Sequence, residues 1–170
     1  MKKCHQCKEM NVRERQGIAV SKWCSACKIQ KILEKKEKHK TTKTYQKSRF
    51  KTLHTKAWKL FSEYVRRKNA NEFGMVQCFT CPTILHWKEA QASHYFHGKL
   101  DFDDRNVRAA CPQCNLYKSG NLAYYGVKLA IIIGVEGMEK LELDSNILKY
   151  SLDDLEEIIA KYTVLNSLFL

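Results

Sequence analysis

The clearest periodic pattern of apolar residues in this chain becomes apparent from Leu53 and predicts an amphipathic helix. Apolar side chains recur there at helical spacing: Leu53, Ala57, Leu60, Phe61, Tyr64 and Val65. Basic residues fill mostly the other positions, which is typical of a helix with one face on a core. We therefore assign the aromatic residues of this stretch to packing rather than to stacking on bases.

A weaker pattern precedes this helix. Residues 28–40 are good helix formers with a thin apolar stripe, and threonines at 41, 42 and 44 then interrupt them. In residues 84–96, apolar and polar side chains alternate over short distances, which predicts two short strands.

The C-terminal part of the chain reads as helical. We expect one helix over 122–133, breaks at Gly134 and Gly137, and a further helical stretch over 138–143. Ser151, with Asp154 three residues later, marks the start of a last helix of the capping-box kind. Strands grouped between helices indicate the α+β class.

The eight cysteines fall into four Cys-x-x-Cys pairs. The first two pairs, Cys4–Cys7 and Cys24–Cys27, lie sixteen residues apart. Two such knuckles at this separation are typical of a structural zinc site with four thiolates. We expect residues 10–21 between them to form a β-hairpin with Gly17 at its turn, and the zinc to supply the folding free energy of this small module.

The other two pairs predict a second structural zinc site. Cys78–Cys81 and Cys111–Cys114 are separated by 29 residues, enough for an inserted pair of strands. The last knuckle should open a helix near Asn115. The sequence shows neither a signal peptide nor an apolar run long enough to span a membrane, so we expect a cytoplasmic protein, in which metal is favoured over disulfides.

The net charge of +12 is concentrated in one segment. Residues 28–68 carry fifteen Lys and Arg against three Glu, while the rest of the chain carries fifteen of each sign. A solvated helix face would explain part of this excess. Together with the neighbouring motifs it favours contact with a nucleic-acid backbone. The candidate contacts on the second half of this segment are Lys56, Lys59, Arg66 and Arg67.

Three residues around the last knuckles suggest phosphodiester hydrolysis. His94 can accept a proton near neutral pH, Asn115 offers an amide oxygen suited to Mg²⁺ or Mn²⁺, and Asn106 can orient the histidine or brace the loop. Asn106 lies twelve positions after His94, and Asn115 lies nine positions after Asn106. This is the order of the ββα-metal (HNH) pattern with its last histidine replaced by asparagine. Lys118, one helical turn beyond Asn115, is placed to meet a phosphate.

One ligand of the catalytic ion is missing from this pattern. Many such sites carry Asp or Glu directly before the strand histidine, where this chain has Ser93, a weak ligand. A nearby carboxylate or water would have to complete the shell. The carboxylates available in sequence are Glu89, Asp101, Asp103 and Asp104.

The region from 57 to 143 resembles the NinG family of phage recombination proteins. The residues that carry the likeness are YVRRKNA, the CFTC knuckle, SHY at 93–95, FDDRNV at 102–107 and CPQCNLYKSGNLAYY at 111–125. The paired N-terminal cysteines and the lysine-rich helical linker extend it over nearly the whole chain. The chain departs from relatives at Ser93, where they commonly carry glycine, and at Gln91, where some carry Asp.

The resemblance implies a metal-dependent DNA endonuclease that cleaves branched recombination intermediates such as Holliday junctions and D-loops. His94, Asn106 and Asn115 would take the active-site roles, with Lys118 and Asn121 in the same block. The two-fold symmetry of a four-way junction favours a homodimer, and phage or host recombination proteins are candidate partners. Two alternatives remain: a non-catalytic zinc protein that binds DNA and recruits partners, and an HNH enzyme that cuts plain duplex DNA.

The expected organisation has four parts. They are a zinc ribbon (1–27), a basic helical DNA-binding segment (28–70), a zinc-framed HNH-like ββα-metal core (71–127) and C-terminal helices (128–170).

Overall fold

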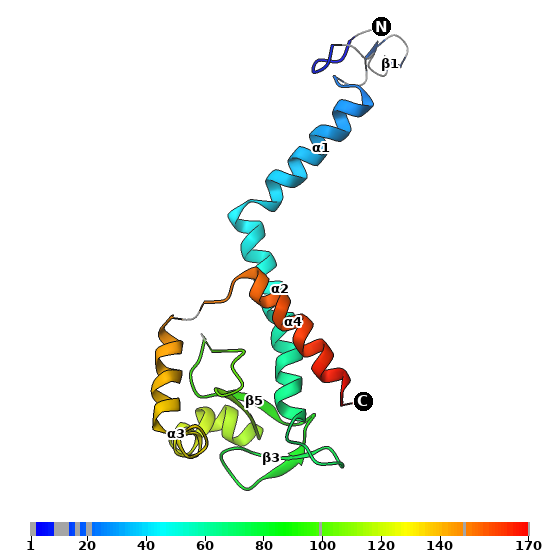
Figure 1. Ribbon diagram of the computed structural model, residues 1–170. Coiled ribbons are helices and arrows are strands. Elements are labelled where there is room, and N and C mark those ends of the chain that lie inside the picture. The colour runs from blue at the N-terminus through cyan, green and yellow to red at the C-terminus, as the bar shows by residue number, and fades with distance from the viewer. Residues whose placement is uncertain are drawn as a thin grey trace. The chain divides into compact units, whose positions relative to one another are not determined.

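The computed structural model describes residues 3–8, 14–15, 18–19, 22–98, 100–147 and 149–169. The fold is a mixed α+β arrangement in which helices predominate and the strands are short (Figure 1). Its helices are α1 (Ser25–Lys40), α2 (Lys43–Arg67), α3 (Leu122–Ile147) and α4 (Leu152–Ser167). The chain divides into two compact units, residues 1–49 and 50–170. Among the described helices, none combines the length and apolar character that a membrane crossing needs.

The strands of the described residues pair into three separate antiparallel hairpins. In the first unit, β1 (Glu14–Arg15) pairs with β2 (Ile18–Ala19), which confirms the predicted hairpin; Gly17, the predicted turn residue, lies outside the described residues. In the second unit, β3 (Met75–Gln77) pairs with β4 (Ile84–His86), and β5 (Gln91–His94) pairs with β6 (Val107–Ala110).

The sequence predicted β4 and β5 but not β3. Three residues that follow a turn are too few to show an alternating pattern, and β3 is recognisable only through its pairing with β4. In the β5–β6 hairpin, His94 is paired with Val107 and Ser93 with Arg108.

The predicted apolar stripe of α2 forms the main core of the second unit. Ala57, Phe61 and Val65, spaced four residues apart, are fully buried. They pack against Leu155 and Tyr162 of α4, so that the two helices lie side by side (Figure 1). The same core contains Phe102 and Val107 of the β5–β6 region.

The ends of the later helices follow local signals. Ser151 and Asp154 form the predicted capping box at the start of α4, with the Asp154 amide 3.1 Å from Ser151 Oγ and the Ser151 amide 2.7 Å from Asp154 Oδ2. Gly134 breaks the helical path of α3 as predicted, with a φ of 73°, whereas Gly137 lies within the helix. Leu129 and Leu141, on either side of the break, are buried together.

Candidate functional site

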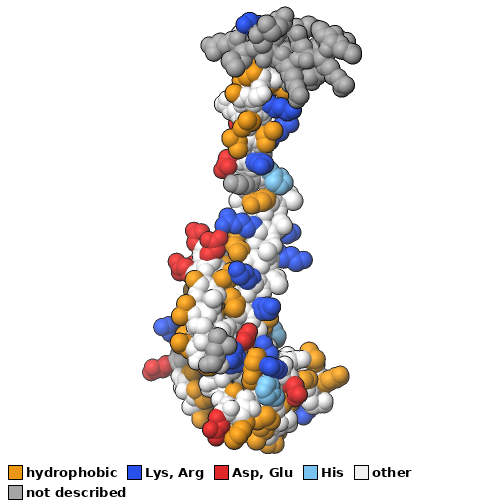
Figure 2. Space-filling view, turned by 90° about the vertical axis from the view of Figure 1, so that its right-hand side faces the viewer, with side chains coloured by type: hydrophobic (Ala, Val, Ile, Leu, Met, Phe, Trp, Pro, Cys, Tyr) orange, Lys and Arg blue, Asp and Glu red, His pale blue; other side chains and the backbone are white. Residues whose placement is uncertain are grey.

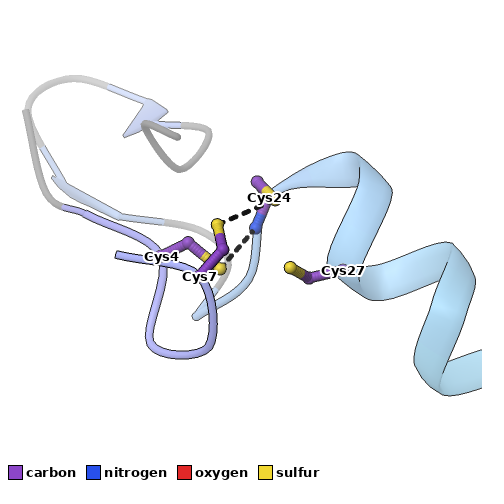
Figure 3. Close-up of side chains that lie close together, drawn as sticks. All are labelled: Cys4, Cys7, Cys24 and Cys27. Atoms are coloured by element: carbon purple, nitrogen blue, oxygen red, sulfur yellow. Dashed lines mark hydrogen bonds between the residues drawn. The ribbon is translucent and has the colours of Figure 1, made fainter. Parts of the chain in front are cut away.

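The first four cysteines converge on one point in the N-terminal unit. Cys4 and Cys7 lie in a turn, Cys24 directly precedes α1 and Cys27 lies in its first turn (Figure 3). Their sulfur atoms all lie within 4.8 Å of one another. Burial raises the pKa of the Cys4 thiol, but the N–H groups of Cys24, Cys7 and Gln6 outweigh it and lower that pKa to about 6. These donors favour a thiolate, the form that binds metal.

The second set of cysteines is built in the same way around the β5–β6 hairpin. Cys78 and Cys81 follow β3, Cys111 directly follows β6, and Cys114 lies in the next helical turn; their sulfurs also fall within 4.8 Å of one another. The Cys114 amide donates to Cys111 Sγ at 3.4 Å. Burial raises the pKa of Cys81, and hydrogen bonds between its sulfur and the side chain and backbone of Thr83 outweigh this and lower the pKa to about 6.

Both cysteine sets fit a structural zinc ion. Four sulfur donors around one point, mostly buried and contacted by N–H groups, are the chemistry of a Cys₄ zinc site. Zinc would fix the ends of the segments that carry the cysteines and contribute to folding. Among the described residues, these two sets are the only groups of three or more His, Cys, Asp or Glu side chains with ligand atoms this close together.

A strained turn follows the last Cys-x-x-Cys pair, Cys111–Cys114, and positions α3. Cys114 and Asn115 belong to a π-helical turn, and Ser119, Gly120 and Asn121 then all have positive φ. A Cβ atom at Gly120 would lie 3.3 Å from Leu122 Cδ2 and 3.6 Å from Ser93 Oγ, so glycine suits both the φ of 83° and the space. Asn121 Nδ2 lies 4.0 Å from Cys114 Sγ, which gives Asn121 a contact with the second set of cysteines.

His94, the predicted base, is held at the end of β5 against α2. Its ring stacks on Trp58 with the centroids 4.7 Å apart and the planes 16° from parallel. Its side chain is only 15% exposed, and its Nε2 lies 3.4 Å from Asp101 Oδ1. Burial lowers the pKa of His94, the charge of Asp101 opposes this, and His97 lowers it further, so the imidazole is neutral at neutral pH.

From the sequence, Asp101 is only one of four carboxylates that could complete the shell of the catalytic ion. In the structure it lies between two imidazoles, because Oδ2 is also 3.2 Å from Nε2 of His54 on α2. The Gly98 amide donates to Oδ1 at 3.2 Å. Sequence reasoning did not anticipate His54; the available signal was its position one helical turn before Trp58, on the same face of α2.

Asn106 is fully buried and braces the loop that follows His94. Its Oδ1 accepts from the Phe96 amide at 2.7 Å, and its Nδ2 donates to the carbonyl oxygens of Phe96 and Leu100 at 2.8 and 3.0 Å. Its own carbonyl accepts from the Tyr125 hydroxyl at 2.9 Å. Of the two roles predicted for Asn106, these contacts correspond to bracing the loop rather than to orienting His94.

Asn115 lies against a different part of β5 from the partners of His94. Its Nδ2 donates to Gln91 Oε1 at 2.7 Å. Side chains alternate along a strand, so Gln91 and Ser93 face the second cysteine knuckle, whereas Ala92 and His94 face α2. Ser93 Oγ is buried and has no hydrogen-bond partner within the described part of the chain.

The oxygens on the Ser93 face do not make a complete site for Mg²⁺ or Mn²⁺. Ser93 and Asn115 offer a hydroxyl and an amide, both neutral, whereas Mg²⁺ is usually bound through one or two carboxylates. The carboxylate nearest to His94 in these contacts, Asp101, is engaged by two imidazoles and an amide. The residues present therefore do not fit a catalytic Mg²⁺ or Mn²⁺ ion.

The predicted DNA-contacting residues divide into two groups. Lys56, Lys59 and Lys118 are exposed. The guanidinium of Arg66 instead contacts the carbonyl oxygens of Trp87 and Ala90, and that of Arg67 contacts Glu63 and the carbonyl oxygen of Phe169. On the face seen in Figure 2, basic side chains are spread along the helices rather than gathered in one compact patch.

Several phage proteins are similar to part of this chain. A "Protein ninG" of Escherichia phage 933W is 35% identical over 89 residues, which cover 50% of this chain and 44% of that protein. A "Protein ninG" of Escherichia phage lambda is 33% identical over 89 residues, covering 50% and 43%. The matched segment thus spans less than half the length of these relatives. No solved structure matches the chain.

The family comparison extends over almost the full sequence. The family described as "Bacteriophage Lambda NinG protein" matches residues 1–167. The chain therefore belongs to the NinG family.

Proposed function

We propose that this protein is a DNA endonuclease that acts on branched recombination intermediates, with His94 as its general base. The observation that carries the proposal is the setting of His94 at the end of the first strand of a hairpin, between Trp58 and Asp101. The return strand leads directly into Cys111 and the helical turn that bears Asn115. This order of strand, strand and helix supports a ββα-metal type of site.

A neutral, oriented imidazole is what proton abstraction from water requires. Burial keeps His94 unprotonated near neutral pH, and the stack on Trp58 limits rotation of its ring. Attack of the resulting hydroxide on phosphorus breaks the P–O bond to the leaving oxygen. That oxygen takes a proton from solvent water, and His94 afterwards returns its proton to solvent. Exposed Lys118, three residues beyond Asn115, supports a phosphate contact beside this region.

Branched DNA is the substrate that we favour because of the family likeness found in the sequence. The excess of positive charge over residues 28–68 supports binding to a polyanionic backbone. Junctions with two-fold symmetry would be cut in pairs, so we propose that the active form is a homodimer and that it works with phage or host recombination proteins in the host cytoplasm.

A second candidate function is DNA binding without catalysis. It is favoured by the neutral character of the Ser93 and Asn115 oxygens, which leaves the shell of a catalytic ion without a carboxylate. In that case the two cysteine sets and the exposed lysines would still serve binding, and His94 would be dispensable.

The decisive experiment compares His94→Gln with His86→Gln, a histidine on the separate β3–β4 hairpin. Wild type and both variants are incubated with a four-way junction, a D-loop and linear duplex, each with Mg²⁺, Mn²⁺ or EDTA. We expect His94→Gln to lower the cleavage rate by roughly 10²–10⁴-fold and His86→Gln to retain it.

Each alternative gives a different outcome. Equal cleavage by wild type and His94→Gln would remove His94 from the chemistry. Binding of the junction without cleavage under every ion condition would favour the accessory protein, and equal rates on junction and linear duplex would favour an HNH enzyme acting on plain duplex.

A further inference from the structure

We propose that His54, Asp101 and His94 form one hydrogen-bonded chain in which Asp101 positions the base and leaves its Nδ1 free to accept the proton. This inference rests on the proposed function, since it assigns a role to residues that act through His94. Asp101 and His54 are positioning residues here, because neither is placed against the reacting atoms.

The geometry of the carboxylate leads to this assignment. Oδ1 of Asp101 lies 3.4 Å from His94 Nε2 and Oδ2 lies 3.2 Å from His54 Nε2, so each oxygen faces one imidazole. The Asp101 side chain is only 16% exposed. A shielded carboxylate accepts hydrogen bonds and does not donate them, so both facing nitrogens should carry their hydrogen.

The nitrogen of His94 that faces Asp101 has no better partner. Nε2 is buried and has no hydrogen-bond partner within the described residues; Asp101 Oδ1, at 3.4 Å, is near enough but not aligned with it. A buried N–H without a partner is costly, and a small rotation of the ring toward Oδ1 would supply one. With Nε2 protonated, the lone pair of the neutral ring lies on Nδ1.

His54 fixes the carboxylate from the helix side. Its ring packs edge-on against Phe102, with the centroids 5.1 Å apart, and lies 5.9 Å from the ring of Phe50. Trp58, one turn later on α2, carries the His94 ring. The helix therefore holds both imidazoles, and the Gly98 N–H holds the carboxylate between them by donating a hydrogen bond to Oδ1.

This arrangement explains why Asp101 does not complete a metal shell. Both of its oxygens are turned toward imidazoles of the α2 side, whereas the Ser93 and Asn115 oxygens belong to the opposite face of β5. The carboxylate instead stabilises the imidazolium that forms when Nδ1 takes a proton.

The test combines NMR of the imidazole N–H groups with cleavage kinetics. The wild-type chain should show an N–H resonance of His94 Nε2 that is protected from exchange with water, identified by its absence in His94→Gln. Asp101→Leu should abolish this resonance and lower kcat by roughly 10–100-fold with KM nearly unchanged, because substrate contacts are not altered.

Two variants separate positioning from plain structural support. In Asp101→Asn the Gly98 amide should keep an oxygen toward His94, so the resonance survives and kcat falls between wild type and Asp101→Leu. Asp153→Asn is the matched control, because Asp153 is exposed in the first turn of α4; it should change neither readout.

The two proposals fail in distinguishable ways. Absence of a protected His94 N–H in the wild-type protein, or wild-type kcat in Asp101→Leu, would overturn the positioning role of Asp101 while leaving His94 as the base. Unchanged cleavage by His94→Gln would overturn the proposed function, whatever the NMR spectrum shows.

Discussion

Replacing Asn106 by alanine should reveal whether this residue serves the fold or the chemistry. The substitution removes three side-chain hydrogen bonds, of 2.7, 2.8 and 3.0 Å, from a fully buried position. Each is worth about 1 kcal/mol net, and a buried partner left unpaired costs about 1–3 kcal/mol. We expect the free energy of unfolding to fall by roughly 3–5 kcal/mol, a large share of the roughly 5–15 kcal/mol of a typical domain.

The assay is urea unfolding at saturating zinc, followed by tryptophan fluorescence. In a Trp23→Phe background the signal comes from Trp58 and Trp87, which both belong to the unit of residues 50–170. Hydrogen exchange of the Phe96 amide, which donates to Asn106 Oδ1, should accelerate in parallel. Asn69→Ala, in an exposed turn, is the control and should unfold like wild type.

One result would refute the structural role of Asn106. If Asn106→Ala unfolds within about 0.5 kcal/mol of wild type, as an ordinary surface substitution does, and yet loses cleavage, Asn106 takes part in the reaction itself.

Three further outcomes follow from the structure. Cys4→Ser and Cys78→Ser should each reduce bound zinc from two ions to one per chain, measured by metal analysis, and only Cys78→Ser should destabilise the unit of residues 50–170. Lys59→Ala should weaken DNA binding at all sequences and reduce the slope of log K against log salt by about 0.9, whereas Arg66→Ala should chiefly lower the urea midpoint. Because burial lowers the pKa of His94, the unfolded chain takes up this proton at a higher pH than the folded chain does. The stability that the neutral imidazole contributes is full above about pH 6.5 and is lost as the pH falls from there through the lowered pKa. The urea midpoint should therefore hold steady down to about pH 6.5 and drop below it, and less so in His94→Gln.

Each of these expectations has a clear contrary result. Two zinc ions retained in Cys78→Ser would place the metal elsewhere. A salt slope that falls as much in Arg66→Ala as in Lys59→Ala would make both residues phosphate contacts. A pH dependence equally steep in wild type and His94→Gln would assign it to other groups, among them Asp101 and His97, which face the ring.

The elements that the sequence predicted well are those fixed by neighbouring residues. Both cysteine clusters follow from Cys-x-x-Cys spacing, because two ligands of each knuckle lie within one turn of chain. The capping box at Ser151 and the buried stripe of α2 also depend on residues three or four apart. In contrast, β3 and the contacts of Asp101 depend on segments that meet only after folding, and no local pattern marks them.

The basic residues at the end of α2 illustrate the same limit. Their charge and their position on the polar side of the helix predicted contact with DNA, and that stays a prediction. The structure gives both guanidiniums other partners: the Arg67 guanidinium lies 4.8 Å from the Trp87 ring centre, and Arg66 bonds to main-chain carbonyls of the β4–β5 turn. A long side chain can leave the polar face of its helix to satisfy buried carbonyls, which a helical pattern does not reveal.

The two faces of β5 give the candidate site its architecture. One face, with Gln91 and Ser93, is held by the knuckle that carries Asn115; the other, with His94, is held by α2. The buried hydroxyl of Tyr125 shares its one hydrogen between the carbonyl oxygens of Ser93 and Asn106, at 3.0 and 2.9 Å, and so connects the end of β5 to the start of the return strand. Because a shift of one residue along a strand exchanges its faces, this tie keeps the base on the α2 side. The placement of His94 therefore depends on the hairpin register as much as on its own side-chain contacts.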